Sequence, residues 1–233
     1  MVHRKAVLPV LSLLISAVAV HAADAKIRIV LIGDSTVNDE GGWGPGFRAS
    51  FGPGVDVINH ARNGRSSKSF RDEGFWGPAL ADKPNYVLIQ FGHNDAPGKG
   101  PERETNPKTT YREYMSRYID ESRAAGAEPV LVTSIVRRNF TPQGKIAIDS
   151  LPPFADEVRF LAMEKKVPLI DLYALTLAQA ERLGPEGCVE IDARDKNGKR
   201  DHTHLGPKGQ QEIGAMAARE LGKVVTALQN YLQ

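Results

Sequence analysis

Short runs of apolar and β-branched residues recur along the chain and alternate with longer stretches of helical composition. The runs cover residues 27–32, 55–58, 86–91, 129–135 and 167–172, and each has the length of a β-strand. The helical stretches lie most clearly at residues 109–125, 154–166, 174–183 and 207–232. Strands that alternate with helices form a parallel sheet with helices on both faces. The sequence therefore predicts an α/β fold.

The beginning of the chain has the composition of a secretory signal. Arg4 and Lys5 precede an apolar run at residues 6–20, and small residues follow around Ala22, which is the pattern of a cleaved signal peptide. The run is shorter than the roughly 20 residues that a membrane-spanning helix needs. We therefore expect residues 1–22 to be a signal peptide, residues 23–233 to form one domain, and the protein to be exported to the periplasm or the medium.

The charge and cysteine content narrow the classes of partner. The chain has 30 Lys and Arg residues; when Arg4 and Lys5 leave with the signal, 28 remain, which equals the number of Asp and Glu residues. A neutral chain offers no electrostatic attraction to nucleic acid or to a membrane surface, so neither is expected as a partner. The only cysteine, Cys188, has no Lys, Arg or His beside it, which favours a buried structural thiol over a nucleophile.

Polar residues gather directly after three of the predicted strands. The stretch "GDSTVN" follows the first strand, "NHARNGRSSKSF" the second and "GHNDAPG" the third. The carboxyl ends of parallel strands meet at one edge of the sheet, and ligands bind there. Ser35 would lie at this edge with its backbone N–H near a helix N-terminus, although a serine after Gly-Asp is also typical of a turn or a helix cap. The Gly-x-Ser-x-Gly pattern of the α/β-hydrolase elbow is absent around it.

The segment "DHTHLGPKG" at residues 201–209 offers a base for that serine. Asp201 precedes His204 by three residues, so in a tight turn its carboxylate reaches the Nδ1–H of the imidazole. The Nε2 atom is then left to take the proton of a serine hydroxyl. A solvated loop or a helix cap is the alternative interpretation of this pattern.

A metal site is a second alternative for the same segment. Asp201, His202 and His204 have ligand side chains, and His93 and Asp95 are the residues that could complete the set. Such a site would leave the serine without a role. We therefore expect no metal, and we assign His202 no chemistry.

Acyl transfer also needs hydrogen-bond donors for the oxyanion of the tetrahedral intermediate. The candidates are the backbone N–H groups of Ser35 and Gly64 and the side-chain amide of Asn94, each in a loop after a predicted strand. Asn63-Gly64 is equally a strong turn signal, and Asn94-Asp95 a possible cap.

Four sequence blocks together resemble the SGNH (GDSL) hydrolases. They contain Gly33-Asp34-Ser35, Gly64, Gly92-His93-Asn94-Asp95 and Asp201-His202-Thr203-His204. The residue sequences of these blocks are most similar to the motifs of the rhamnogalacturonan acetylesterase branch. They read "GDST", "ARNGRSS", "IQFGHND" and "DHTH". The resemblance implies a flavodoxin-like three-layer α/β/α sandwich with a five-stranded parallel sheet, and a single catalytic domain that needs neither metal nor cofactor. It also implies that Ser35 is the nucleophile, His204 the base and Asp201 its orienter, with Ser35, Gly64 and Asn94 as the oxyanion hole.

The substrate expected from this resemblance is an acetylated polysaccharide, specifically pectic rhamnogalacturonan. Arg62, Arg65, Lys68 and Arg71 form a basic cluster after the second strand, and such a cluster attracts chains that contain uronic acids. Arg65 and Trp43 are the candidate substrate-binding residues, Trp43, like Trp76, by stacking on a sugar ring. Pairing of the arginines with Asp72 and Glu73, and burial of the tryptophans in the core, are the structural alternatives. An exported lipase or thioesterase of the same fold, or a non-catalytic carbohydrate-binding protein, are the alternative functions.

Overall fold

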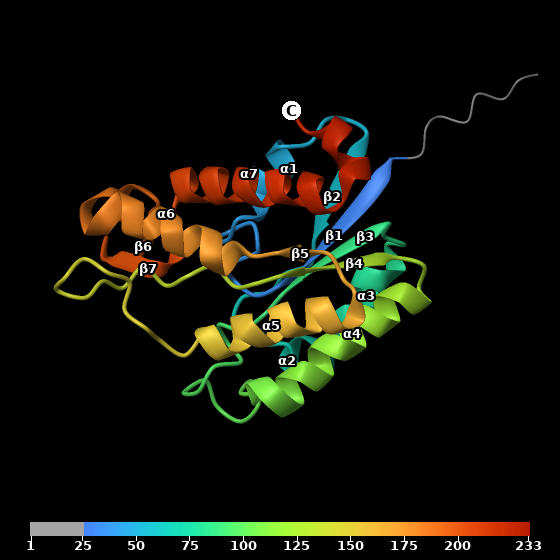
Figure 1. Ribbon diagram of the computed structural model, residues 1–233, viewed down its shortest axis with the longest axis horizontal. Coiled ribbons are helices and arrows are strands. Elements are labelled where there is room, and N and C mark those ends of the chain that lie inside the picture. The colour runs from blue at the N-terminus through green and yellow to red at the C-terminus, as the bar shows by residue number, and fades with distance from the viewer. Residues whose placement is uncertain (1–25) are drawn as a thin grey trace, which may run out of the picture.

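The computed structural model describes residues 26–233, and the predicted signal peptide lies outside the described residues. Five parallel strands form one sheet in the order β2-β1-β3-β4-β5 (Figure 1). They are β1 (Ile27–Gly33), β2 (Val55–Asn59), β3 (Tyr86–Gln90), β4 (Glu128–Val132) and β5 (Leu169–Ile170). The five predicted strands and the α/β class are therefore confirmed.

Helices connect successive strands and cover both faces of the sheet (Figure 1). The α-helices are α1 (Gly44–Ala49), α2 (Ser69–Asp72), α3 (Trp76–Ala81), α4 (Arg112–Ala124), α5 (Pro152–Lys165), α6 (Leu172–Gly187) and α7 (Pro207–Val224). Shorter turns are η1 (Pro107–Tyr111), η2 (Cys188–Glu190) and η3 (Thr226–Tyr231). The predicted helix 207–232 is divided into α7 and η3. None of the helices in residues 26–233 has the length and apolarity that crossing a membrane requires.

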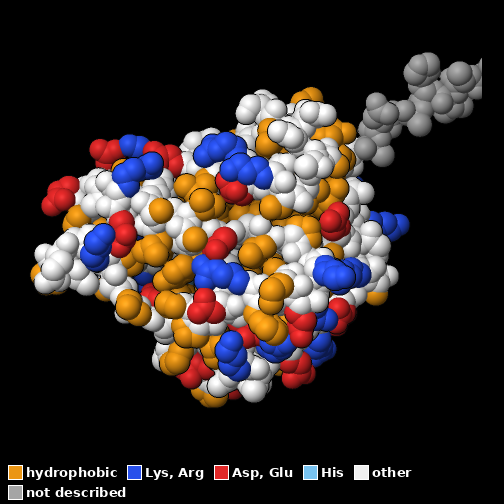
Figure 2. Space-filling model, in the orientation of Figure 1, with side chains coloured by type: hydrophobic (Ala, Val, Ile, Leu, Met, Phe, Trp, Pro, Cys, Tyr) orange, Lys and Arg blue, Asp and Glu red, His pale blue; other side chains and the backbone are white. Residues whose placement is uncertain are grey.

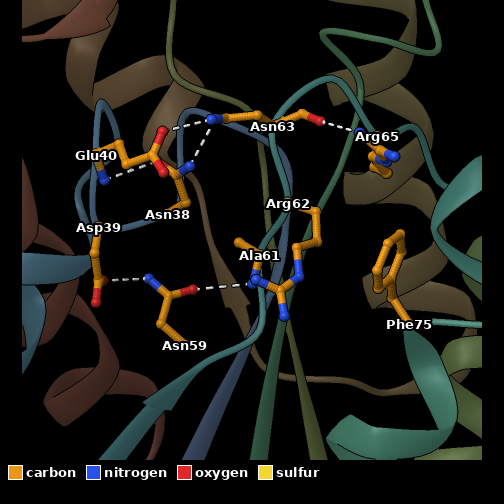
Figure 3. Close-up of a pocket in the computed structure, with 9 residues that line it drawn as sticks. All are labelled: Asn38, Asp39, Glu40, Asn59, Ala61, Arg62, Asn63, Arg65 and Phe75. Atoms are coloured by element: carbon orange, nitrogen blue, oxygen red, sulfur yellow. Dashed lines mark hydrogen bonds between the residues drawn. The ribbon is translucent and has the colours of Figure 1, made fainter.

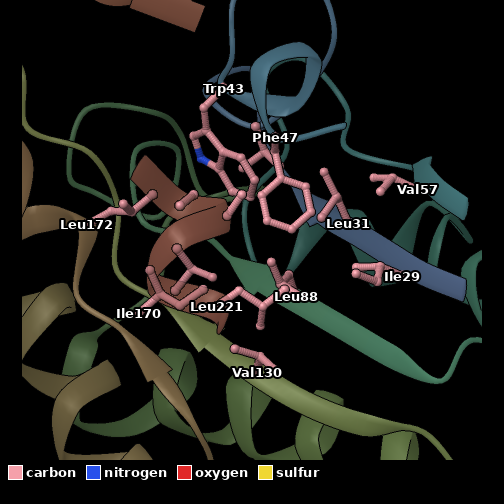
Figure 4. Close-up of a cluster of buried hydrophobic side chains, with 14 of the residues drawn as sticks. Ile29, Leu31, Trp43, Phe47, Val57, Leu88, Val130, Ile170, Leu172 and Leu221 are labelled. Atoms are coloured by element: carbon pink, nitrogen blue, oxygen red, sulfur yellow. The ribbon is translucent and has the colours of Figure 1, made fainter. Parts of the chain in front are cut away.

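The apolar strand residues alternate between two cores. Ile29 and Leu31 face one side of the sheet, where they pack with Phe47 of α1 and Leu221 of α7 (Figure 4). Val30 and its alternate neighbours face the other side, where α3, α4 and α5 cover them. A strand buried on both faces reads as a continuous apolar run, which is why these strands were visible in the sequence.

Helices α1 and α7 approach each other closely because both present glycine at the contact. A Cβ on Gly46 would lie 2.2 Å from the carbonyl oxygen of Gln210, and a Cβ on Gly214 would lie 2.3 Å from the backbone nitrogen of Phe47. Any side chain at either position would separate the helices. The contact fixes the segment after β1 against the helix that follows residues 201–205.

A two-stranded antiparallel hairpin, β6 (Asp192–Arg194) and β7 (Arg200–Leu205), lies beside the main sheet and is not hydrogen-bonded to it as a strand (Figure 1). The sequence predicted a turn in residues 201–204, and this was wrong, since they belong to β7. Charged residues dominate the hairpin, so it has none of the apolar alternation by which a strand is recognised.

The prediction of a buried structural thiol is confirmed, because Cys188 is free and buried.

Candidate active site

The structure brings together two residues that are far apart in the sequence, Ser35 and His204. The Nε2 atom of His204 lies 2.8 Å from the Oγ of Ser35, although 169 positions separate the two residues. The Nδ1 atom of His204 lies 2.7 Å from the Oδ2 of Asp201. Hydroxyl, imidazole and carboxylate thus form a continuous hydrogen-bonded series, with the spacing of a nucleophile, a base and an orienting acid.

The environment of Asp201 keeps its carboxyl group ionised. Partial burial raises its pKa, but hydrogen bonds from the His204 imidazole and from the backbone N–H groups of Thr203 and His204 outweigh burial and lower the pKa to about 2. A carboxylate only accepts hydrogen bonds. The proton between the two side chains therefore lies on Nδ1, and Nε2 is free to accept the hydroxyl proton of Ser35.

A bulge in β7 brings the acid to the imidazole. Asp192 pairs with Leu205 and the next residue, Ala193, pairs with Asp201, so β7 advances four residues while β6 advances one. Extra residues on one strand bend it and redirect its side chains. In a regular strand, residues three apart would point to opposite faces. The bulge lets the carboxylate of Asp201 contact both the backbone and the ring of His204.

Three unused N–H donors converge beside the serine. Ser35, Gly64 and Asn94 line one hollow of about 450 Å³ together with Asp201 and His204. Within residues 26–233 the backbone N–H groups of Ser35 and Gly64 have no acceptor. The amide of Asn94 donates one N–H to the carbonyl oxygen of Arg65 at 3.2 Å, which leaves its second N–H available. Gly64 has a φ of +74°, which favours glycine.

A series of buried hydrogen bonds supports the turn that contains Ser35. The indole N–H of Trp43 donates to Gln90 at 2.9 Å, Gln90 donates to the hydroxyl of Thr36 at 2.8 Å, and Thr36 donates to Asp34 at 2.7 Å. Burial raises the pKa of Asp34, against the effect of these bonds. The expected helix N-terminus at Ser35 was wrong, because residues 34–40 form turns and α1 begins at Gly44.

The prediction that Trp43 stacks on a sugar was therefore also wrong. Its side chain is fully buried and packs against Phe47. Trp76 is buried as well, and its indole N–H donates to Glu121. The glycines around Trp43 suggested exposure, but they serve close packing: a Cβ on Gly42 would lie 2.4 Å from backbone atoms of Thr36 and Val37.

Asp95 ties together the loops after β2 and β3. Its fully buried carboxyl accepts hydrogen bonds from the backbone N–H and hydroxyl of Ser67 and from the hydroxyl of Thr105. Burial raises its pKa to about 7 although those bonds oppose the shift. His93, next to Asn94, is also buried. Burial is the larger cause, and the positive charge of the nearby Arg137 the second, that lowers the pKa of its imidazole well below the ordinary value.

A second hollow adjoins the basic cluster after β2. It encloses about 390 Å³, and its lining includes Arg62, Arg65, Asn63, Glu40 and Phe75 (Figure 3). Asn63 and Glu40 also line the hollow around the serine, so the two are contiguous. Arg65 is paired with Glu73 and donates to the carbonyl oxygen of Asn63 at 2.9 Å, whereas within the described residues the guanidinium of Arg62 has no hydrogen-bond acceptor.

A third hollow, of about 220 Å³, meets the first at Ser35 and His204. Lys99, Arg137 and Thr203 line it in addition to the residues shared with the first hollow. Lys99 and Arg137 were not singled out from the sequence, because a lysine between glycines and an arginine in a long loop are ordinary surface residues by pattern alone. Within residues 26–233 no three His, Cys, Asp or Glu side chains are arranged to hold a metal ion.

Known proteins with similar sequences were found over most of the chain. A family model described as GDSL-like Lipase/Acylhydrolase matches residues 31–212. The rhamnogalacturonan acetylesterase RhgT of Bacillus subtilis is 36% identical over 224 residues, which cover 88% of this chain and 94% of that protein. The probable rhamnogalacturonan acetylesterase YesY of the same organism is 35% identical, with coverage of 85% and 95%.

Solved structures show the same fold. The crystal structure of YxiM from Bacillus subtilis superimposes with a TM-score of 0.69 at 27% identity and covers 85% of this chain, while this chain spans 57% of YxiM. The acetylxylan esterase Axe2 from Geobacillus stearothermophilus superimposes with a TM-score of 0.62 at 18% identity, with coverage of 85% and 95%. The sequence, the fold and the relatives agree that this chain belongs to the GDSL-like lipase/acylhydrolase family and is a carboxylic ester hydrolase.

Proposed function

We propose that the protein removes acetyl groups from a polysaccharide through an acyl-enzyme on Ser35, and that the polysaccharide is pectic rhamnogalacturonan. The observation that carries the proposal is the hydrogen-bonded series from Ser35 through His204 to Asp201, beside three free N–H donors. Identities of 35–36% to rhamnogalacturonan acetylesterases over at least 94% of their length support the substrate.

In the proposed first step, the Oγ of Ser35 attacks the acetyl carbonyl carbon while its proton moves to Nε2 of His204. The carbonyl oxygen becomes an oxyanion, which the free N–H groups of Ser35, Gly64 and Asn94 stabilise. The bond from the acetyl carbon to the sugar oxygen then breaks, and His204 returns the proton to that oxygen. The products are the free sugar hydroxyl and an acetyl ester on Ser35.

In the second step, water attacks the acetyl ester and gives one proton to His204. Acetic acid leaves and ionises to acetate in solution, and the proton on His204 returns to the Oγ of Ser35. Asp201 stays ionised throughout because its pKa lies near 2. It orients the imidazole and stabilises the positive charge that His204 carries in each step.

The composition of the hollows supports a sugar over a lipid. Polar and charged side chains and glycines line the hollow at Ser35, where Ala193 is the only residue with an apolar side chain. An acyl chain would need an apolar groove to leave water. A sugar instead needs donors and acceptors for its hydroxyl groups.

The charges around the serine support a substrate with carboxylates. The acids that line the three hollows are each hydrogen-bonded: Asp39 to Arg48 and Asn59, Glu40 to Asn63, and Asp201 to His204. By contrast, Arg62, Lys99 and Arg194 line these hollows without an acidic partner in the described residues. Elsewhere basic and acidic side chains are intermixed, as the face in Figure 2 shows. Glu40 has only the uncharged amide of Asn63 as its partner, but the three unpaired basic side chains outnumber it, and this positive excess favours a uronate chain.

Acetate release tests this proposal directly. We expect release from acetylated rhamnogalacturonan, less from acetylated xylan, and none from the Ser35→Ala variant. Activity of Ser35→Ala equal to wild type would overturn the acyl-enzyme. Equal activity on rhamnogalacturonan before and after chemical reduction of its carboxyl groups would overturn the uronate preference.

Charge-neutralising variants locate that preference. Arg62→Gln and Lys99→Gln should each raise KM on the uronate polymer and leave hydrolysis of a small chromogenic acetate ester unchanged. Arg219→Gln, at an exposed arginine on α7, removes the same charge away from the site and should change neither. An equal rise of KM in Arg219→Gln would mean that only the net charge matters.

Export is proposed from the composition of residues 1–22. Expression of the full chain in a bacterial host, followed by mass spectrometry of the exported protein, should give a new N-terminus near Ala23. Retention of the intact chain in the cytoplasm would contradict the signal peptide.

A further inference from the structure

The hairpin that carries Asp201 and His204 needs an attachment to the rest of the protein, because its strands do not pair with the main sheet. A displacement of the imidazole by about 1 Å relative to Ser35 is enough to lower turnover by about 10²-fold. Whatever holds β7 against the loops of the main sheet therefore controls the reaction.

Arg138 makes one such attachment from the interior of the protein. It belongs to the segment between β4 and α5, and its side chain is only 2% exposed. Its guanidinium donates to the carboxylate of Asp192 in β6 and, at 2.7 Å, to the backbone carbonyl oxygen of His204. Its backbone N–H donates to the carbonyl oxygen of His202 at 2.8 Å. One residue thus binds both strands of the hairpin.

The contacts of Arg138 complete the fixation of the His204 backbone. The N–H of His204 donates to the Oδ1 of Asp201 at 3.1 Å, and its carbonyl oxygen accepts from Arg138. The next residue, Leu205, donates its N–H to the carbonyl oxygen of Gly41, in the turn after β1. The peptide groups on both sides of the Cα of His204 are therefore held, which leaves its side-chain torsions to be set by Asp201 and Ser35.

Each of the three guanidinium nitrogens of Arg138 donates a hydrogen bond. Asp192 is 5% exposed, and its second carboxylate oxygen accepts from Arg200 of β7, with the Nδ1 of His202 at 3.6 Å. Arg138 also donates to the carbonyl oxygen of Val136 at 3.2 Å. A planar guanidinium presents several donors in fixed directions, whereas a lysine ammonium presents one point charge. Only arginine can bind Asp192 and the His204 carbonyl at the same time.

We propose that Arg138 is a positioning residue for the acid–base strand: its bonds to Asp192 and to the His204 carbonyl hold the imidazole at the distance from Ser35 that proton transfer requires. This inference rests on the proposed role of Ser35 and His204. It adds a residue outside the four sequence blocks, one that contacts neither the substrate nor the reacting atoms.

The test compares Arg138→Lys with a chemically matched control. Arg159 pairs with Asp171 through two bonds of 2.8 and 2.9 Å, between α5 and the start of α6 and away from β7. Arg138→Lys keeps the charge opposite Asp192 but loses the bond to the His204 carbonyl. We expect its kcat on a chromogenic acetate to fall about 10²-fold with KM unchanged, whereas Arg159→Lys should keep the kcat of wild type even where its Tm falls.

A second readout follows the serine itself. A fluorophosphonate forms a bond from phosphorus to the Oγ of Ser35 and releases fluoride, and the serine proton passes to His204. The rate of this labelling should fall in Arg138→Lys in parallel with kcat and stay at the wild-type value in Arg159→Lys. A folded Arg138→Lys protein with wild-type kcat and wild-type labelling rate would overturn the proposal.

If Arg138→Lys does not fold, the double variant Arg138→Met/Asp192→Asn decides the question. Removal of both charges leaves no uncompensated carboxylate in the interior, and Arg200, which loses its bond to Asp192, is 20% exposed to water, so this variant is expected to fold. It lacks the donor to the His204 carbonyl, so it should also be slow in labelling, and wild-type labelling in it would overturn the proposal. Failure of wild-type protein to be labelled at Ser35 would instead overturn the proposed acyl-enzyme.

Discussion

The two halves of the candidate active site are built from different kinds of interaction. Ser35, Gly64 and Asn94 follow strands of the main sheet, and the turn with Ser35 rests on a fully buried tryptophan and on a hydrogen-bond series that ends at the buried Asp34. Asp201 and His204 lie on a small hairpin that charged groups, Arg138, Asp192 and Arg200, hold in place. The nucleophile half thus depends on apolar packing and on buried hydrogen bonds to Asp34 and Asp95, which form no ion pair in the described residues, and the acid–base half depends on ion pairs.

This difference means that changes in the two halves have different signatures. Loss of packing under Ser35 reduces the free energy of unfolding of the whole domain, because the same side chains form the core. Loss of a charged group in the hairpin alters geometry at His204 and affects turnover first. Variants at four positions test this contrast.

The largest effect is expected from Asp201→Asn in the hairpin. An amide no longer fixes the proton on Nδ1 of His204, so Nε2 is no longer reliably free to accept the serine proton, and kcat should fall by about 10⁴-fold. Steady-state kinetics on a chromogenic acetate measures this. Asp195→Asn, in the turn between β6 and β7, is the control and should keep wild-type kcat; a similar loss there would point to general disruption of the hairpin.

In the nucleophile half, Trp43→Ala should act through stability. Removal of a fully buried indole costs about 3–5 kcal/mol in the free energy of unfolding. Trp43→Phe keeps most of the packing and loses the bond to Gln90, so it should cost about 1–3 kcal/mol. Urea unfolding measures both values. Equal losses in the two variants would show that the hydrogen bond, and not the packing, supports the turn.

Asp95, in the nucleophile half, should make the free energy of unfolding depend on pH between about 4 and 7. Asp201, in the acid–base half, should not. The folded-state pKa of Asp95, about 7, lies above the ordinary value of 3.8, so between these values the folded protein retains a proton that the unfolded chain loses. This contribution to stability is present at low pH and is lost as pH rises through 7, by up to about 1.4 kcal/mol per pH unit.

Urea unfolding of wild type and Asp95→Asn between pH 5 and 8 isolates this contribution, and the difference between the two should change with pH. Asp201, with a pKa near 2, stays ionised over the whole range. A pH-independent difference between the two proteins would contradict the raised pKa of Asp95.

The smallest effect is expected at Gly41, where the two halves touch. A Cβ at this position would lie 3.2 Å from the Cβ and Cδ2 atoms of His204, so Gly41→Ala should push the imidazole by a few tenths of an ångström and lower kcat about tenfold. Gly77→Ala in α3, whose added Cβ meets no atom within 4 Å, should leave kcat unchanged. A wild-type kcat in Gly41→Ala would show that the imidazole tolerates such a shift.

The sequence predicted the main sheet and the nucleophile half better than the hairpin. Strands buried on both faces are visible as apolar runs, and the loops after them contain the polar residues Ser35, Gly64 and Asn94. The five residues predicted for the triad and the oxyanion hole do line one hollow. The parallel-sheet topology explains this success, since it places all carboxyl ends of the strands at one edge.

What could not be predicted depends on contacts between distant segments. Residues 192–205 are charged and short of apolar residues, so nothing local indicates that they pair as strands. Arg138 lies in a loop, and only its contact with a hairpin more than 50 positions later makes it a buried residue. The glycines beside Trp43 are required because other backbone segments approach them closely. Such an approach is a property of the tertiary structure and is not visible in the local sequence.

The distance in sequence between the serine and its base has a consequence for synthesis. Ser35 comes from the central strand region near the start of the described chain, and His204 from a segment that α7 must anchor against α1. A nascent polypeptide that ends before residue 204 therefore lacks the proposed base for Ser35, and we expect it to be inert toward esters. Under the proposed mechanism, hydrolytic capacity therefore arises only after α7 has docked against α1.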